Sequence, residues 1–163
     1  MERIGSGSAS STRCEMRLYL DLCCFNRPYD DQSQTRIRLE TEAKLVLQQK
    51  IRDGQCELVW SAVMDFENAK SPFVEHLQAI AAWRKLACEC VIVDAVVLKS
   101  AHELLMRGVR EYDALHVACA ISANADVFVT TDDRLINKLR GREAIRAMPP
   151  GDALAFLEKW YEN

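Results

Sequence analysis

The sequence predicts an α/β protein, specifically an α/β/α sandwich with a central parallel sheet of about five strands. Two observations support this fold class. Short apolar runs of strand length alternate along the chain with longer segments that have the apolar spacing of helices. Gly and Pro stand at the ends of several of these segments, where they stop or start a helix. No internal repeat or second domain is visible, so residues 16–163 are expected to form a single domain.

The short apolar runs are expected to be buried strands. In chain order they are RLYL (17–20), CELVW (56–60), CVIV (90–93), VFVT (127–130) and AIRAM (144–148). Because helical segments separate them, the strands are expected to run parallel, with helices on both faces of the sheet.

The helices follow from their apolar spacing and from the residues at their ends. They are expected over 33–53, 61–67, 72–87, 95–107, 111–123, 132–140 and 152–161, and NRPYDDQS after the first strand is expected to be a turn. Ser61 is a favourable N-cap, and Ser71 before Pro72 predicts a helix start with proline at its first position. Gly54 and Gly108 stand where two of the helices should end.

The composition is ordinary for a globular protein. A chain of 163 residues is long enough for a core that needs no disulfide or structural metal. Its net charge of −3 means that a nucleic-acid partner needs a local basic surface. No apolar stretch reaches the roughly 18 residues that span a bilayer, and no hydrophobic signal region begins the chain. We therefore expect a cytoplasmic protein without a membrane partner.

The cysteines and the N-terminus add two expectations. The seven cysteines are odd in number, Cys23 and Cys24 are adjacent, and no C-x-x-C pair occurs. This pattern favours reduced thiols over a disulfide framework or a zinc site. Residues 1–15 have the composition of a linker, so a flexible tail or a cloning remnant is expected there, with Met16 as a candidate natural start.

Four acidic residues lie at the ends or starts of apolar runs: Asp21, Glu67, Asp113 and Asp132. Asp21 closes the first strand, and Asp132 closely follows VFVT. In open α/β sheets, sites form just outside the carboxyl ends of the strands. Burying an unpaired carboxylate is costly, so carboxylates gathered there indicate a site for a divalent cation.

Each acid also has a simpler interpretation when it is taken alone. Asp113 and Asp132 begin helices, where an aspartate is usually an N-cap or a partner of the helix dipole. Asp21 fits a plain turn residue. Glu67 fits a solvated helix residue, and its neighbour Asp65 competes for any role. All four map to one edge of one expected sheet, and this conjunction favours the cation site.

Four segments resemble, in order, the motifs of the PIN domain family of metal-dependent ribonucleases: YLD (19–21), SAVMDFE (61–67), DALHVACA (113–120) and VTTDDRL (129–135). The resemblance covers residues 16–148, and the family includes the VapC-like toxins of type II toxin–antitoxin pairs. There are two departures. Leu22–Cys23 follow the first acid, where the family often has Asn, Ser or Thr, and Arg134 stands where some members have a fifth acid.

The resemblance implies Mg²⁺- or Mn²⁺-dependent hydrolysis of single-stranded RNA. Asp21, Asp113 and Asp132 would then be the metal ligands, and Glu67 would bind a second ion or orient the attacking water. Without metal, four clustered carboxylates repel one another, so at least one should have a raised pKa. An antitoxin is implied as a partner if the protein is a toxin, and a homodimer is implied through the helices at 33–53 and 72–87.

RNA binding requires positive charge near the acids. Five basic residues lie between positions 134 and 146: Arg134, Lys138, Arg140, Arg142 and Arg146. Arg134 and Lys138 share one helical face just after Asp132, and with Thr130 and Arg27 they are our candidates for RNA contacts. A solvated helix face is the alternative interpretation of these charges.

Other interpretations are weaker or stay open. His116 on the Asp113 helix fits a general base, but a packed, hydrogen-bonded core histidine is favoured. An aspartate-nucleophile phosphatase lacks its D-x-D signature here, since Leu22 and Cys23 follow Asp21, and a receiver-type signalling module lacks its late lysine. A PIN domain that has lost catalysis and only binds RNA or protein is the alternative that remains.

Overall fold

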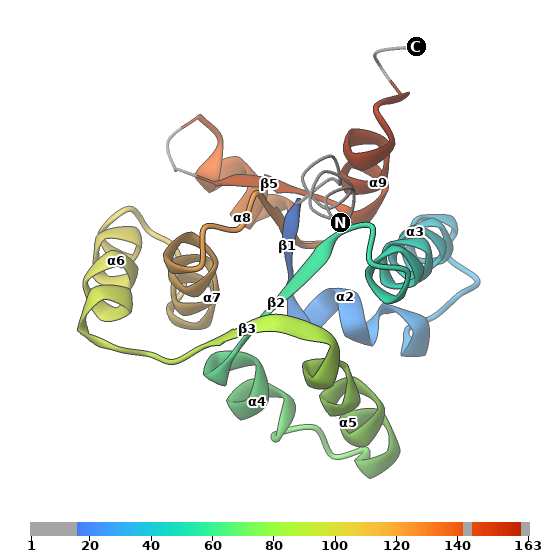
Figure 1. Ribbon diagram of the computed structural model, residues 1–163, viewed down its shortest axis with the longest axis horizontal. Coiled ribbons are helices and arrows are strands. Elements are labelled where there is room, and N and C mark those ends of the chain that lie inside the picture. Colours follow the sequence, from blue (N-terminus) through green and yellow to red (C-terminus); the bar gives the residue numbers. More distant parts are fainter. Residues whose placement is uncertain (1–15, 142–144, 161–163) are drawn as a thin grey trace, which may run out of the picture.

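The structure is a computed structural model that describes residues 16–141 and 145–160, and it contains one five-stranded parallel sheet (Figure 1). The strand order is β3-β2-β1-β4-β5. The strands are β1 (Arg17–Leu20), β2 (Glu57–Ser61), β3 (Ala87–Val91), β4 (Val127–Val129) and β5 (Arg146–Met148). All pairings are parallel, which confirms the predicted sheet.

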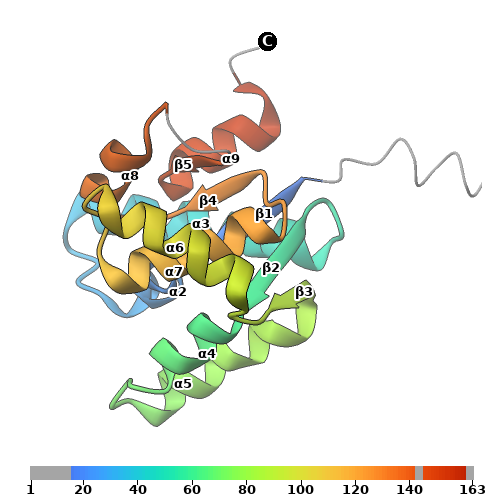
Figure 2. The ribbon, with the colours of Figure 1, turned by 90° about the vertical axis from the view of Figure 1, so that its left-hand side faces the viewer.

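Helices cover both faces of the sheet. Helices α3 (Thr35–Arg52) and α9 (Pro150–Glu158) lie on one side, and α6 (Ala95–Met106) and α7 (Glu111–Ser122) lie on the other (Figure 1). Helices α4 (Ala62–Asn68) and α5 (Val74–Ala81) lie side by side at the β3 end of the sheet (Figure 2). The shorter elements are α2 (Leu22–Asn26), α8 (Asp133–Leu139) and the 3₁₀ helices η1 (Arg27–Tyr29) and η2 (Ala82–Leu86).

Strand β1 lies at the centre of the sheet and of the core. Tyr19 of β1 is fully buried and pairs with Val59 of β2 and with Phe128 of β4. Strands β1 and β4 read as continuous apolar runs because both of their faces are covered. After β1 the chain continues to β2 on one side, whereas β4 lies on the other side. This is a topological switch point, where α/β sheets open a crevice at their carboxyl ends.

The structure differs from the expected helices in two places. Helix α2, where no element was expected, lies between β1 and the expected turn at 26–33, and Asp21 caps it by accepting a hydrogen bond from the Leu22 N–H. The first part of that turn is η1, whose first turn suits Pro28, and the rest is irregular as expected. The helix expected from Pro72 begins only at Val74. The Ser71 hydroxyl oxygen accepts a hydrogen bond from the Phe73 N–H (3.2 Å), and this local turn competes with a helical start.

The third strand is also placed differently from the expectation. CVIV (90–93) was the expected segment, but β3 starts earlier, and its Cys90 and Val91 pair with Trp60 and Ser61 of β2. Ile92 and Val93 lie past the end of the strand and are exposed. Their apolar side chains are therefore part of the surface beside α6. From hydrophobicity alone, these exposed residues could not be told apart from the buried residues of the strand.

Other boundaries follow the sequence closely. Gly54 and Gly108 have positive φ angles of 74° and 91° just after α3 and α6, which glycine adopts without strain, so they stop these helices as predicted. Helix α9 starts at Pro150, two residues before the expected start, since proline suits the first helical turn. The expected tail over 1–15, the start of the strand expected at 144–148 and residue 161 of the last helix lie outside the described residues.

The expectations about thiols and membranes can be compared with the described part of the chain. Disulfide bonds do not join Cys23, Cys24, Cys88, Cys90 or Cys119, in agreement with the predicted thiols, and Cys14 lies outside the described residues. Among the described helices, none is long and apolar enough to cross a membrane.

Candidate metal centre

The structure brings the four predicted acids together at the carboxyl ends of β1 and β4. Asp21 directly follows β1, and Asp132 follows β4 and precedes α8. Glu67 comes from α4 and Asp113 from the first turn of α7. The negative charges of Asp21, Asp132 and Glu67 all act on the Asp113 carboxyl group, so the four acids form one electrostatic cluster.

Asp21 is buried, and hydrogen-bond donors stabilise its charge. The Leu22 N–H donates to Asp21 Oδ1 (2.8 Å), and the Thr130 hydroxyl donates to Oδ2 (2.9 Å). Buried carboxylates persist only with such partners. Asp21 therefore caps α2, whereas the simpler interpretation made it a plain turn residue, and it also faces the cluster. Thr130 is fully buried, so its hydroxyl serves this contact inside the protein.

Asp132 is held from both sides. Its Oδ1 accepts hydrogen bonds from the Arg134 and Leu135 N–H groups (2.9 and 3.3 Å), so it is the N-cap of α8. Its own N–H donates to the Thr130 hydroxyl oxygen (3.2 Å). Because the same hydroxyl donates to Asp21, Thr130 ties the two aspartates together. The Asp132 side chain can thus cap α8 and also belong to the acidic cluster.

Asp113 carries the electrostatic strain of the cluster. Burial first, and then the nearby negative charges of Asp21 and Asp132, together raise its pKa to about 6. This confirms the expectation that one of the four acids has a raised pKa. Perturbed carboxyl groups of this kind are concentrated at functional sites.

Glu67 meets a histidine in the cluster. Its Oε1 lies 2.8 Å from His116 Nε2, and the same nitrogen lies 4.0 Å from Asp21 Oδ1. Asp21, Glu67 and His116 offer ligand atoms that lie within 4.8 Å of one another. The competing acid Asp65 turns elsewhere, because it accepts hydrogen bonds from the Trp60 indole and from Arg84 (2.9 Å each).

His116 is the part of the site that the sequence indicated least clearly. It is packed and hydrogen-bonded, as expected for a core histidine, and only 1% of its side chain is exposed. Its partner Glu67 could not be inferred from sequence, since the two residues are 49 positions apart. The available signal was the i, i+3 spacing from Asp113, which places both on one face of α7.

The donor set suits a divalent cation. Carboxylate oxygens dominate it, and these are the ligands that hard divalent cations prefer. Asp21, Glu67, Asp113 and Asp132 are the residues that could hold the ion. A cation there would also relieve the repulsion that raises the pKa of Asp113.

Comparison with known protein families identifies the family of this chain. The sequence model of the PIN domain matches residues 20–140, a segment that includes all four acids. The chain belongs to the PIN domain family. Among curated proteins, no relative matches the sequence.

Three solved structures have a similar fold. VapBC2 from Rickettsia felis, bound to a promoter DNA fragment, is 15% identical with a TM-score of 0.51, covering 81% of this chain and 97% of that one. DNA-bound VapBC from Salmonella typhimurium is 17% identical with a TM-score of 0.50, covering 83% and 98%. PAE2754 from Pyrobaculum aerophilum is 17% identical with a TM-score of 0.50, covering 90% and 99%. These similarities support the PIN fold.

Basic side chains border the acidic cluster of this PIN domain. A pocket of about 270 Å³ is lined by Asp113 and Asp132 together with Arg110, Arg134 and Lys138. Arg134 and Lys138 are exposed, as predicted for their helical face, and Lys138 Nζ donates to the Gly108 carbonyl. Arg110 was not among the predicted residues, although it lies three positions before Asp113.

Arg27 differs from these cations because it is already paired. Its guanidinium donates to Glu40 (2.8 Å) and to Asp30 (3.0 Å). Asp133, adjacent to Asp132, likewise turns away and accepts two hydrogen bonds from Arg36 (2.9 Å each). An RNA phosphate at Arg27 would have to compete with two carboxylates. Arg27 remains a predicted RNA contact, but its positive charge is already paired with Glu40 and Asp30.

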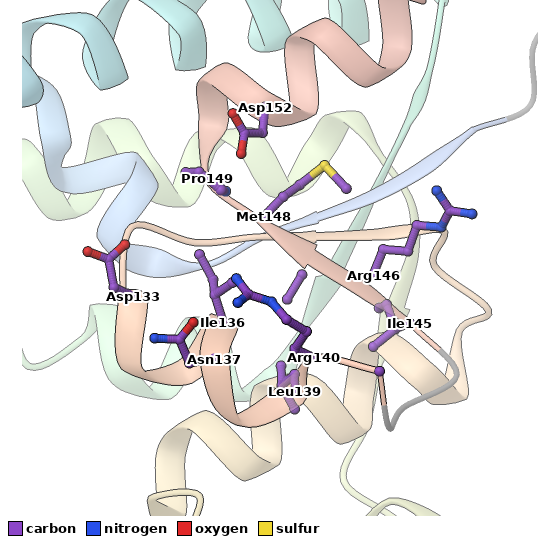
Figure 3. Close-up of a pocket in the computed structure, with 12 residues that line it drawn as sticks. Asp133, Ile136, Asn137, Leu139, Arg140, Ile145, Arg146, Met148, Pro149 and Asp152 are labelled. Carbon is purple, nitrogen blue, oxygen red and sulfur yellow. The ribbon is translucent and has the colours of Figure 1, made fainter. Parts of the chain in front are cut away.

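A separate pocket of about 650 Å³ lies on the other side of α8 (Figure 3). Arg140 borders it at the end of α8 and Arg146 from β5, whereas Asp152 lies at the start of α9. None of the four clustered acids lines it. Two further cations of the basic stretch therefore lie near α8, and Arg142 falls outside the described residues.

Proposed function

We propose that this PIN domain is a Mg²⁺- or Mn²⁺-dependent endoribonuclease that hydrolyses phosphodiester bonds of single-stranded RNA. The observation that supports it best is the convergence of Asp21, Glu67, Asp113 and Asp132 from four separate elements. Burial and mutual repulsion raise the pKa of Asp113 to about 6, so the cluster is costly without a cation. Family membership supports the same activity.

The chain's own residues would divide the work as follows. Asp21, Asp113 and Asp132 hold the ion, which supplies charge neutralisation at the phosphate and lowers the pKa of a bound water. Glu67 orients the attacking water or binds a second ion. Arg134 and Lys138 hold backbone phosphates beside the cluster, and Thr130 keeps Asp21 and Asp132 in register.

The cellular setting we propose is that of a cytoplasmic toxin with an antitoxin partner. The structures from Rickettsia felis and Salmonella typhimurium are VapBC proteins, and they share this fold. An antitoxin segment that covers the acidic cleft would silence it, most effectively by placing an arginine among the carboxylates. A homodimer is also proposed, because α3 exposes Leu39, Leu45 and Val46. Co-purification with the product of a neighbouring small reading frame tests the antitoxin.

The activity is tested by two measurements on the same protein. Calorimetric titration with Mn²⁺ should show binding, and an unstructured RNA should be cleaved only when Mg²⁺ or Mn²⁺ is present. Asp113→Asn should abolish both, whereas Asp152→Asn, at a first-turn acid of α9 outside the cluster, should leave both unchanged. Mn²⁺ binding without metal-dependent cleavage would refute the nuclease and favour a module that only binds RNA or protein.

A further inference from the structure

A chain of buried hydrogen bonds leads from the core to Glu67. The Ser61 hydroxyl lies 2.6 Å from the Tyr19 hydroxyl, which lies 2.6 Å from His116 Nδ1. His116 Nε2 then lies 2.8 Å from Glu67 Oε1. Ser61 and Tyr19 are fully buried and His116 almost so, whereas the Glu67 side chain is partly exposed. Four elements, β2, β1, α7 and α4, thus contribute to one polar path.

The chemistry of the end group fixes which atom donates. An ionised carboxylate can only accept, so His116 Nε2 must carry the hydrogen that faces Glu67. Nδ1 is then free to accept from the Tyr19 O–H, and Tyr19 can accept from the Ser61 O–H. Ser61 in turn accepts from the Met64 N–H (3.2 Å). Every polar group of this path is satisfied in that direction, as buried networks require.

The orientation of the Glu67 carboxylate depends on this path, whereas Asp21 and Asp132 have other hydrogen-bond donors. Asp21 and Asp132 are held by backbone N–H groups and by Thr130. Within the described residues, the Glu67 carboxylate accepts a hydrogen bond only from His116. Tyr19 stacks on Phe128 of β4 (ring centroids 5.4 Å apart), so the histidine ring is fixed against the central strands.

We propose that His116 is a positioning residue: it donates Nε2–H to Glu67 and sets the orientation of that carboxylate, while Tyr19 and Ser61 hold the imidazole. In this arrangement His116 is not a metal ligand, although its nitrogen lies close to Asp21 and Glu67. The protein ligands of the ion would then be carboxylate oxygens, which favours Mg²⁺ and Mn²⁺ over zinc. This inference rests on the proposed nuclease function for its kinetic consequences.

The experiment compares His116→Leu, His116→Gln and Tyr19→Phe in the full chain. His116→Leu should lower kcat by about 10- to 100-fold at unchanged KM for RNA, the usual effect of losing a group that orients a metal ligand. His116→Gln keeps an N–H donor near the Nε2 position and should recover most of this loss. Tyr19→Phe keeps the ring packing and removes only the hydroxyl, so a smaller loss on the order of 10-fold is expected. Tyr29→Phe, at a half-exposed tyrosine outside the path, is the matched control.

A spectroscopic measurement separates this inference from the nuclease proposal. ¹⁵N NMR of the imidazole should show a proton on His116 Nε2, and Mg²⁺ should leave it in place. Loss of that proton on adding Mg²⁺, or a wild-type kcat in His116→Leu, would overturn the positioning role. If the wild-type protein cleaves no RNA, the nuclease proposal fails. The ¹⁵N spectrum then decides the inference: a proton that stays on His116 Nε2 when Mg²⁺ is added supports it, and loss of that proton refutes it.

Discussion

Replacing Asp113 by asparagine should stabilise the metal-free protein while it abolishes metal binding. Asp113 is half-buried among three other acids, and these surroundings raise its pKa from 3.8 to about 6. A shift of that size corresponds to about 3 kcal/mol between the two protonation states. Because water screens a half-exposed carboxyl group, we expect roughly 1–2 kcal/mol of this to appear in the free energy of unfolding.

The stability difference between Asp113→Asn and the wild type should depend on pH. A carboxyl group with a raised pKa in the folded state is protonated in both states below pH 3.8, so it costs nothing there. As the pH rises through about 6, the folded protein must ionise a group that the unfolded chain ionises easily, and stability is lost. The advantage of Asp113→Asn should therefore be absent at low pH and complete above the folded pKa.

Urea denaturation in EDTA at several pH values from about 4 to 7.5 measures this difference. Asp152→Asn serves as control, since it also removes a first-turn acid and its interaction with a helix dipole. Adding Mg²⁺ should reverse the order, because only the wild-type site gains stability from the bound ion. This prediction is contradicted if Asp113→Asn is less stable than the wild type above pH 7, or if its stability differs from the wild type by the same amount at every pH.

Three further outcomes are expected from the same structure. Lys44→Met should raise the free energy of unfolding at pH 7 by about 3 kcal/mol, because burial lowers the pKa of Lys44 from 10.5 to about 8. Urea titration should show this gain fading as the pH rises from about 8 to 10.5. Thr130→Val should cost about 1–3 kcal/mol in urea denaturation and weaken Mn²⁺ binding in calorimetry, since Asp21 loses a buried donor. Arg134→Gln and Lys138→Gln should each lower RNA affinity and reduce its salt dependence by about one ion, as measured by fluorescence anisotropy. An unchanged salt dependence would favour a merely solvated helix face.

The sequence allowed the sheet and the clustering of the acids to be predicted for one physical reason. Polar residues at the ends of buried parallel strands must lie at one edge, and Asp21 and Asp132 follow the adjacent strands β1 and β4. Glu67 was supported by the capping serine six residues before it, and Ser61 does cap α4. The catalytic roles of these acids stay predictions.

Other features depend on tertiary contacts that leave no local trace. The Glu67–His116 contact joins two helices from separate crossovers. Arg110 lies beside the acids only because α7 and α8 approach each other at their first turns. The predicted boundaries of β3 were wrong because Ile92 and Val93, although apolar, are exposed and lie beyond the strand. An apolar residue is buried only where another helix or strand covers it, and the sequence does not show which residues are covered.

The pairing of β1 with β4 has a consequence for the synthesis of this protein. Asp21 and Asp132 become neighbours only after the ribosome has added more than a hundred residues between them. The Thr130 hydroxyl that joins them is also made late. Non-local strand pairing is slow compared with local folding. A nascent or truncated chain that ends before β4 therefore lacks an assembled cluster. During synthesis, the four acids can come together only after β4 and Asp132 have been made.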